Sequence, residues 1–189
     1  MQNIFVISSY TNGGKDSVIR RLLGMDLGLV RLITVTSRAM RPGEAEGDPY
    51  YFLTRGEFEE RIAAGEFLEW AHVHNDYKGN LKSSFGAVPG DKDIIIQLDV
   101  QGYARYREIF AGKPYRIVGI FIDVPSFDVL QERMVARGGD LYDMRKRLDD
   151  AKVEREHIGE YDYVVMNDDL DRCVSDVAEI IRKESRRPE

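Results

Sequence analysis

The 189-residue sequence has one cysteine, no long apolar run and no excess of positive charge. The single cysteine, Cys173, excludes an internal disulfide and is typical of a protein from a reducing compartment. No segment approaches the roughly 18 apolar residues of a membrane-spanning helix, and Met1–Ser9 lacks the basic start of a secretion signal. The formal net charge of −6 argues against a nucleic-acid partner. We therefore expect a soluble cytoplasmic protein without nucleic-acid or membrane partners.

Apolar residues make up 43% of the chain, which is enough for a substantial core. The main apolar runs are continuous rather than alternating, as in strands that are buried on both faces of a parallel sheet. A helical pattern follows each run. The expected strands are Ile4–Ile7, Ile94–Leu98, Ile117–Val124 and Val164–Met166, and the expected helices are Ser17–Leu23, Gln101–Phe110, Phe127–Arg137 and Leu170–Lys183. This succession predicts the α/β fold class, with a parallel sheet flanked by helices.

Two stretches interrupt this alternation within what we expect to be a single domain over residues 1–189. The first, Thr34–Val88, is rich in turns and predicts an inserted lobe. Its one clear helix begins at Thr54, which forms a capping box with Glu57 three residues later. The second is the break Gly138–Tyr142 inside a charged helical hairpin over residues 126–162, and it predicts a short lid.

The segment Ser8–Ser17 lies between the first strand and the first helix, where a phosphate-binding loop is found in many α/β proteins. Gly13 and Gly14 allow backbone N–H groups to face an anion, and Lys15 can reach its terminal phosphates. The loop departs from the pattern GxxxxGK[ST] at its first glycine, replaced by a serine, and at the residue after the lysine, replaced by Asp16. A glycine-rich turn with a surface lysine is the alternative.

A second anion site is predicted in segment 36–52. Arg38 and Arg41 lie three positions apart on a loop rich in proline and glycine, and tyrosines follow them. Guanidinium groups bind phosphate through two parallel hydrogen bonds, and a phenol adds a donor. The alternative is a solvated loop whose arginines pair with Glu44 and Glu46.

Two carboxylates stand out beside apolar strand residues. Glu69 lies within the expected strand 67–74, where it can accept hydrogen bonds from two adjacent donors of a base. Asp99 follows a buried strand, at the sheet edge where open α/β sheets bind ligands. An edge strand of alternating character is the other interpretation of Glu69, and it explains His72 and His74 better than a metal site does.

Arginines flank the expected lid and can place positive charge over a nucleotide. They are Arg133, Arg137, Arg145 and Arg147. The alternative is a charged helical hairpin, because possible acidic partners lie nearby at Asp149, Asp150 and Glu154.

In this order, the motifs resemble the guanylate kinase family over nearly the whole chain. The resemblance rests on the Lys15 loop and the sequences RPGE, GEFLEW, LDVQG and YDYVVMNDDLD. It implies a P-loop kinase-like core with an inserted nucleoside-monophosphate-binding lobe and a lid. It also implies transfer of the terminal phosphoryl group of ATP to GMP or dGMP, with Mg²⁺ as cofactor. The sequence leaves both a monomer and a homodimer open.

The resemblance also implies roles for individual residues. Lys15, Arg137 and Arg147 (or Arg145) correspond to catalytic positions. The positions expected at the GMP site are Thr34, Arg38, Arg41, Glu44, Tyr50, Glu69, Lys78, Asn80 and Asp99. Those expected around ATP are Asn12, Gly13, Gly14, Lys15, Ser17, Arg133, Asn167 and Asp168. Asp16 departs from the family pattern, and so does Gln97, which stands where a carboxylate is usual. We expect that the carboxylate has moved from the strand to the loop and that Asp16 is the Mg²⁺ ligand; the alternative is that Asp16 caps the first helix.

Several departures from the family pattern leave other functions open. Lys78 replaces a phosphate-binding tyrosine, Asn80 replaces a serine or threonine, and Gln97 replaces a carboxylate. The GKDS loop is similar to that of ribose bisphosphate kinases, so a kinase for a ribose phosphate is one alternative. A non-catalytic binding module of the guanylate kinase type is another. Glu69 argues against the first and Lys15 against the second.

Overall fold

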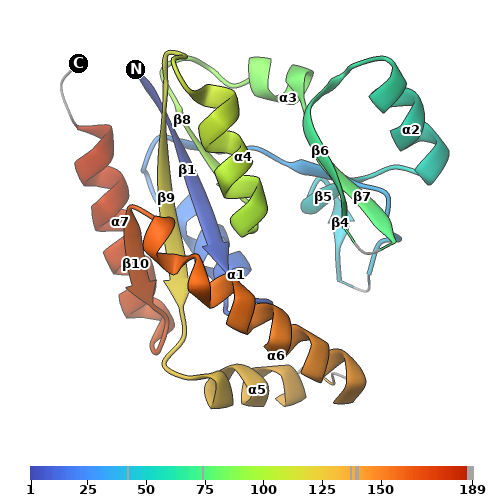
Figure 1. The fold of residues 1–189 in the computed structure, drawn as a ribbon. Coiled ribbons are helices and arrows are strands. Elements are labelled where there is room, and N and C mark those ends of the chain that lie inside the picture. The colour runs from blue at the N-terminus through green and yellow to red at the C-terminus, as the bar shows by residue number, and fades with distance from the viewer. Residues whose placement is uncertain (42, 74, 137, 139–140, 187–189) are drawn as a thin grey trace. The chain divides into compact units, whose positions relative to one another are not determined.

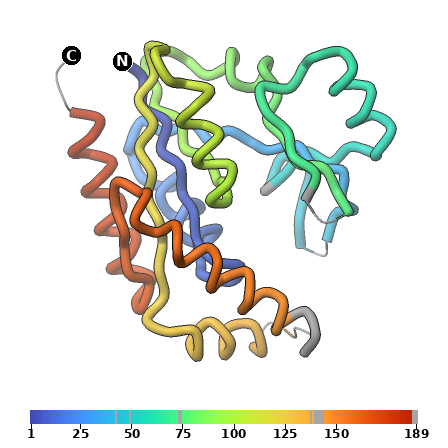
Figure 2. Tube along the Cα trace, viewed as in Figure 1, coloured from blue at the N-terminus to red at the C-terminus, as the bar shows by residue number. Residues whose placement is uncertain are grey.

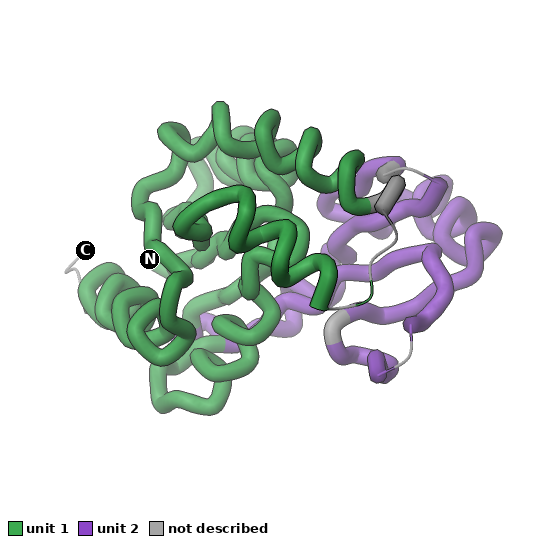
Figure 3. The backbone as a smooth tube through the Cα atoms, turned by 90° about the horizontal axis from the view of Figure 1, so that it is seen from below, with its two compact units in different colours: residues 1–29, 93–189 green, residues 30–92 purple. Residues whose placement is uncertain are grey.

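The computed structural model describes residues 1–41, 43–73, 75–136, 138 and 141–186. The chain divides into two compact units (Figure 3). The core unit comprises residues 1–29 and 93–189, and the inserted unit comprises residues 30–92. The lobe expected at residues 34–88 falls within the inserted unit.

A parallel sheet forms the centre of the core unit, as the continuous apolar runs predict (Figure 1). Ile4 of the first strand lies opposite both Ile94 and Ile117. The strand order is β10-β9-β1-β8-β2. The strands are β1 (Gln2–Ser9), β8 (Asp93–Gln97), β9 (Tyr115–Asp123), β10 (Tyr163–Met166) and β2 (Leu29–Arg31), at which the chain leaves the core unit.

Helices cover both faces of this sheet. They are α1 (Lys15–Leu23), α4 (Val100–Phe110), α5 (Phe127–Ala136), α6 (Leu141–Glu156) and α7 (Leu170–Ser185), with a 3₁₀ turn at Ile158–Glu160. On one face, α1 and α7 pack against β1 and β9. On the other face lies α4, whose Tyr103 ring occupies the place of a side chain at Gly119 on β9. In Figure 2, the end of β9 leads into α5, and α6 then runs back towards the sheet.

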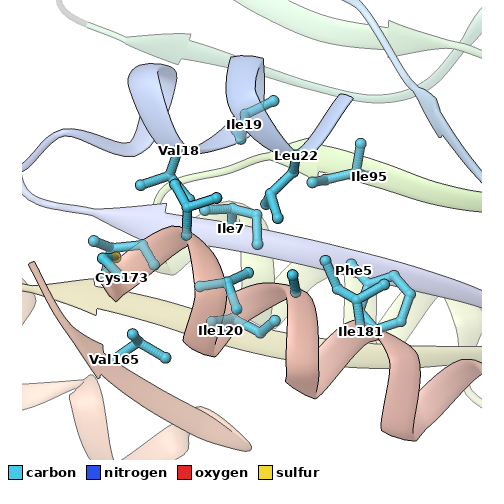
Figure 4. Packing of buried hydrophobic residues seen from close by; sticks show 14 of the residues in the cluster. Phe5, Ile7, Val18, Ile19, Leu22, Ile95, Ile120, Val165, Cys173 and Ile181 are labelled. Atoms are coloured by element: carbon cyan, nitrogen blue, oxygen red, sulfur yellow. The ribbon is translucent and has the colours of Figure 1, made fainter. Parts of the chain in front are cut away.

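The core between β1, α1 and α7 is built from apolar residues at helical spacing (Figure 4). Its members include Phe5, Ile7, Val18, Ile19, Leu22, Ile120, Val165, Cys173, Val177 and Ile181. Cys173 is fully buried, and burial raises the pKa of its thiol to about 11. The cysteine therefore stays protonated and acts as a small apolar packing residue.

The inserted unit has a mixed sheet in the order β4-β5-β3-β7-β6. Its elements are β3 (Thr34–Thr36), β4 (Ala45–Glu46), β5 (Pro49–Phe52), α2 (Arg55–Ala63), β6 (Phe67–Val73), β7 (Asp76–Leu81) and α3 (Lys82–Gly86). The capping box predicted at Thr54 and Glu57 is present. Phe58 on α2 stacks on the rings of Phe67 and Tyr77, with centroids 4.3 and 5.2 Å away, and this aromatic cluster fixes α2 on the sheet.

Some element boundaries differ from those expected. The first helix begins at Lys15 rather than Ser17, and its N-cap is Gly14 in a left-handed conformation that glycine adopts readily. The helix α3 has only five residues and ends at Gly86, and Pro89 and Gly90 follow it. Of the expected lid, residues 139 and 140 lie outside the described part of the chain.

Candidate active site

The loop between β1 and α1 has the backbone of an anion-binding turn. Asn12 adopts φ 66° and Gly14 φ 101°, two left-handed conformations of the kind found where backbone N–H groups form an anion-binding turn. Asparagine tolerates this region better than most residues do. The amide of Gly13 closes a turn on the Tyr10 carbonyl at 2.9 Å. Lys15 then opens α1 and brings the positive end of the helix to the loop.

Two residues expected near ATP hold this loop in place. The Asn167 side chain donates from Nδ2 to the Gly13 carbonyl at 2.7 Å. Arg133 donates from Nη1 to the same carbonyl at 3.3 Å and from Nη2 to the Asn167 carbonyl at 2.7 Å. A Cβ at Gly14 would lie 2.3 Å from Asn167 Nδ2, so glycine is required there for space as well as for φ. In this structure both side chains therefore position the loop backbone.

The two departures in the loop have separate environments. Ser9 is buried, and its hydroxyl has no hydrogen-bond partner among the described residues. A Cβ at Gly13 would lie only 1.9 Å from this hydroxyl, so Ser9 fills the space above that glycine. Asp16 is exposed in the first turn of α1. Asp16 makes no capping bond, because the N-cap is Gly14 and no side chain accepts there, but its negative charge lies in the first turn, where the positive end of the helix favours it.

Glu154 on α6 interacts electrostatically with Lys15 of the phosphate loop, whereas the sequence suggested it only as an ion-pair partner of the lid arginines. Burial raises the pKa of its carboxyl to about 7. The charge of Lys15 opposes this pKa shift, and the charges of Asp99 and Asp150 add to it. A signal was present in the sequence: Glu154 follows the buried Ala151 by three positions and therefore shares its helix face.

In the inserted unit, Arg38 and Glu44 form a two-pronged ion pair. Arg38 donates from Nη2 to Glu44 Oε1 at 2.5 Å and from Nη1 to Oε2 at 2.7 Å. These bonds raise the pKa of the guanidinium and lower that of the carboxyl. The ion pair between a loop arginine and Glu44, which was the alternative to a phosphate site, is thus present for Arg38. Glu46 instead accepts a hydrogen bond from the Phe52 backbone amide. The Arg38 guanidinium also lies 5.1 Å from the ring centre of Tyr50.

Strand register places several of the expected GMP-site residues on one face of the inserted sheet. Glu69 lies opposite Asn80, and Lys78 is two positions from Asn80 on β7. Thr34 lies opposite Tyr50, and its β3 neighbour Thr36 lies opposite Lys78. Because alternate residues of a strand share a face, Thr34, Tyr50, Glu69, Lys78 and Asn80 project to the same side. The Lys78 ammonium lies 5.8 Å from the Tyr50 ring centre, which agrees with this placement.

The remaining predicted residues have the following environments. Arg41 is exposed, and its amide donates to Glu44 at 2.8 Å. Asp99 caps α4 through a bond from the Gly102 amide at 2.8 Å. Asp168 forms an ion pair with Arg172 on the protein surface. Ser17 lies half-buried in α1, Arg147 half-buried and Arg145 exposed in α6, and Arg137 and His74 lie outside the described residues.

Comparison with known proteins identifies the family. The guanylate kinase family profile matches residues 1–184. The guanylate kinase of Rhizobium meliloti is 39% identical over 186 residues, 97% of this chain and 84% of that protein. The guanylate kinase of Dechloromonas aromatica is 35% identical over 95% of this chain and 88% of that protein. This chain belongs to the guanylate kinase family. The crystal structure of the Anaplasma phagocytophilum guanylate kinase, 30% identical, superposes with a TM-score of 0.80 and covers 98% of this chain and 87% of that one.

This guanylate kinase family member has no helix, among those described, that is long and apolar enough to cross a membrane. In the same described part of the chain, no three His, Cys, Asp or Glu side chains gather closely enough to hold a metal ion by themselves.

Proposed function

We propose that this protein transfers the terminal phosphoryl group of ATP to GMP or dGMP, giving ADP and GDP or dGDP. Membership of the guanylate kinase family supports a nucleoside-monophosphate kinase. The observation that carries the choice of acceptor lies in the inserted unit. There, one sheet face presents a carboxylate, Glu69, together with Lys78 and the phenol of Tyr50.

Glu69 supplies the base selectivity in this proposal. Guanine presents a ring N–H and an exocyclic amine side by side, and an ionised carboxylate offers two acceptors to this pair. Adenine places a lone pair at the ring position, which would face a carboxylate oxygen. Sites built on such polar pairing reject the wrong partner by roughly 10⁴-fold or more. Thr34 is an additional hydroxyl on the same face, and Asp99 of the core unit is the second proposed acceptor.

Charge on the same sheet face is proposed to hold the phosphate of GMP. Arg38 has five N–H donors, of which two bond to Glu44 and one to the Ala39 carbonyl. Glu44 therefore orients the guanidinium without using all of its donors. Lys78 adds a point charge, Arg41 a second guanidinium and Tyr50 a phenol donor.

On the donor side, the loop backbone and Lys15 are proposed to bind the phosphates of ATP. Catalysis then consists of positioning and charge neutralisation, with no covalent enzyme intermediate. Arg147 on α6 and Arg137, which lies outside the described residues, are the proposed sources of positive charge over the moving phosphoryl group. Arg133 and Asn167 contribute through the loop that they hold.

Magnesium is proposed to bind with the phosphates of ATP, where it would neutralise their charge. The residues present fit this role, because Asp16 and Ser17 offer a carboxylate and a hydroxyl in the first turn after Lys15. Oxygen ligands of this kind are those that Mg²⁺ prefers, and it commonly takes one or two from the protein. The reaction is proposed to take place in the cytoplasm, where ATP and GMP are available.

The test is an ADP-release assay with GMP, dGMP, AMP and ribose 1,5-bisphosphate as acceptors. We expect turnover with GMP and dGMP and almost none with the other two. Glu69→Gln should lose most GMP turnover while the melting temperature stays unchanged, and the matched control Glu66→Gln, at an exposed position just before β6, should behave as wild type. Turnover of AMP equal to that of GMP would refute the assignment of Glu69. Preference for the ribose bisphosphate would replace the proposal with that of a sugar-phosphate kinase, and failure to bind ATP in calorimetry would indicate a binding module.

A further inference from the structure

The strands β6 and β7 bring Asn80 against the proposed base-reading carboxylate. A register shift between Phe67 and Glu69 marks a β-bulge, after which Glu69 lies opposite Asn80. Asn80 Nδ2 donates to Glu69 Oε1 at 2.7 Å. Gly79 makes the close approach possible, since a Cβ there would lie 2.7 Å from the Glu69 carbonyl and 2.9 Å from Trp70 Cβ. The β-bulge, Gly79 and Asn80 together fix the orientation of the Glu69 carboxylate.

The orientation of the Asn80 amide follows from chemistry. Its side chain is fully buried, and Oδ1 has no hydrogen-bond partner among the described residues. Turning the amide over would place Oδ1 against the oxygen of an ionised carboxylate, which is repulsive, so Nδ2 must face Glu69. A buried acceptor without a partner is costly, so the bond that Nδ2 donates to Glu69 is what favours this orientation of the amide.

We propose that Asn80 is a positioning residue that holds the Glu69 carboxylate in its ionised, double-acceptor form, so that guanine binding depends on the pair and not on Glu69 alone. This inference rests on the proposed function of the inserted unit. Only the ionised carboxylate offers two acceptors, because a protonated one presents a donor at one oxygen. A hydrogen bond donated to the charged form favours that form over the neutral acid.

Other charged groups on the same sheet face must be considered in any pH experiment. Lys78 lies two residues from Asn80 on β7, and Tyr50 lies on β5. The guanidinium of Arg38 stacks over the Tyr50 ring and is paired with Glu44. None of these groups is altered by substitution at position 80. A difference in GMP affinity between variants at the same pH therefore reports on the Asn80–Glu69 pair.

Two substitutions at Asn80 should have opposite pH dependence. Asn80→Ala removes a donor that favours the ionised form of Glu69, so GMP binding should weaken, and more so towards acidic pH. Asn80→Asp keeps the shape but places a second carboxyl beside Glu69. At low pH the two share one proton, and the buried Asp retains it as a donor to Glu69. At high pH both ionise, the donor is lost, and GMP binding weakens.

The experiment measures GMP dissociation constants by calorimetry between pH 5.5 and 8.5. The control is Asn75→Asp, which adds the same charge at an exposed turn of the same hairpin. Ratios of each variant to this control cancel the titration of the GMP phosphate. We expect Asn80→Ala to weaken binding by about tenfold to a hundredfold at pH 7.5, the range for a hydrogen bond to a charged group. We expect Asn80→Asp to match the control near pH 5.5 and to fall behind it as the pH rises.

Two results would overturn the inference. One is that both variants bind GMP as the control does at every pH. The other is that both lose affinity by the same factor at every pH, which would mean that Asn80 only stabilises the sheet. Because binding is measured directly, the result does not depend on turnover. Failure of the proposed function would appear separately, as wild-type protein that binds GMP but releases no ADP when ATP is added.

Discussion

Glu154 offers a test of the electrostatics at the phosphate loop. Its carboxyl lies on α6, and burial raises its pKa to about 7 against an ordinary value of 4.5. The folded protein thus favours the protonated, neutral acid, whereas the unfolded chain ionises it near pH 4.5. The stability that this group contributes is fully present below pH 4.5 and is lost as the pH rises through 7. We therefore expect Glu154→Gln, which is neutral at all pH values, to gain stability relative to wild type as the pH rises.

The expected size follows from the shift. A difference between 4.5 and about 7 corresponds to about 3 kcal/mol, at about 1.36 kcal/mol per pKa unit. Glu154 keeps part of its contact with water, so solvent screening should reduce the effect to about 1–2 kcal/mol.

Urea unfolding at pH 5 and pH 8.5 measures this difference. The free energy of unfolding of Glu154→Gln, minus that of wild type, should increase by about 1–2 kcal/mol between the two pH values. Glu156→Gln is the control, because Glu156 lies exposed on the same helix and its replacement removes the same charge. A difference that is constant from pH 5 to pH 8.5 would show that the folded state does not favour protonated Glu154.

Three further predictions concern the nucleotide. Binding of Mg-ATP at pH 7.5 should take up protons, because the phosphates neutralise the charge of Lys15, which lowers the Glu154 pKa in the free protein. Calorimetry in buffers of different ionisation enthalpy should detect this uptake, and Glu154→Gln should abolish it. Asn167→Ala should weaken Mg-ATP binding about tenfold while leaving GMP binding unchanged, since it removes a buried bond of 2.7 Å to the phosphate loop; equal ATP affinity in calorimetry would contradict this. Asp16→Asn should raise the Mg²⁺ concentration needed for half-maximal turnover, and the double variant with Gln97→Asp should need less Mg²⁺ than Asp16→Asn alone. An unchanged Mg²⁺ titration would contradict the proposal that Asp16 takes the part of the carboxylate missing at Gln97.

The architecture of the core unit was readable from the sequence because it depends on local pattern. Continuous apolar runs such as Ile94–Leu98 predicted buried parallel strands, and the pairing of β1 with β8 and β9 confirms them. The capping box at Thr54 was likewise readable, because all of its groups lie within four residues. Boundaries that depend on a left-handed residue, such as the start of α1 after Gly14, were not.

Contacts across long sequence distances could not be read in this way. Family resemblance placed Asn167 near the nucleotide, but its bond to Gly13 spans 154 positions and exists only because β10 and β1 flank β9. The pKa of Glu154 depends on which face of α6 turns inwards, and the resemblance contains no information on this because no motif includes that residue. For Arg38, the residue pattern allowed both phosphate binding and an ion pair, and the structure shows the ion pair with Glu44.

The unusual residues of the phosphate loop also acquire meaning only in three dimensions. Compared with the pattern GxxxxGK[ST], Ser9 and Asp16 look like two independent losses. In the structure, however, the Ser9 hydroxyl occupies the volume that any side chain at position 13 would need. A Cβ at position 13 would force the Ser9 hydroxyl to turn away, and it would also lie 3.1 Å from the Tyr10 carbonyl. Glycine at position 13 therefore fits the space that Ser9 and the Tyr10 carbonyl leave.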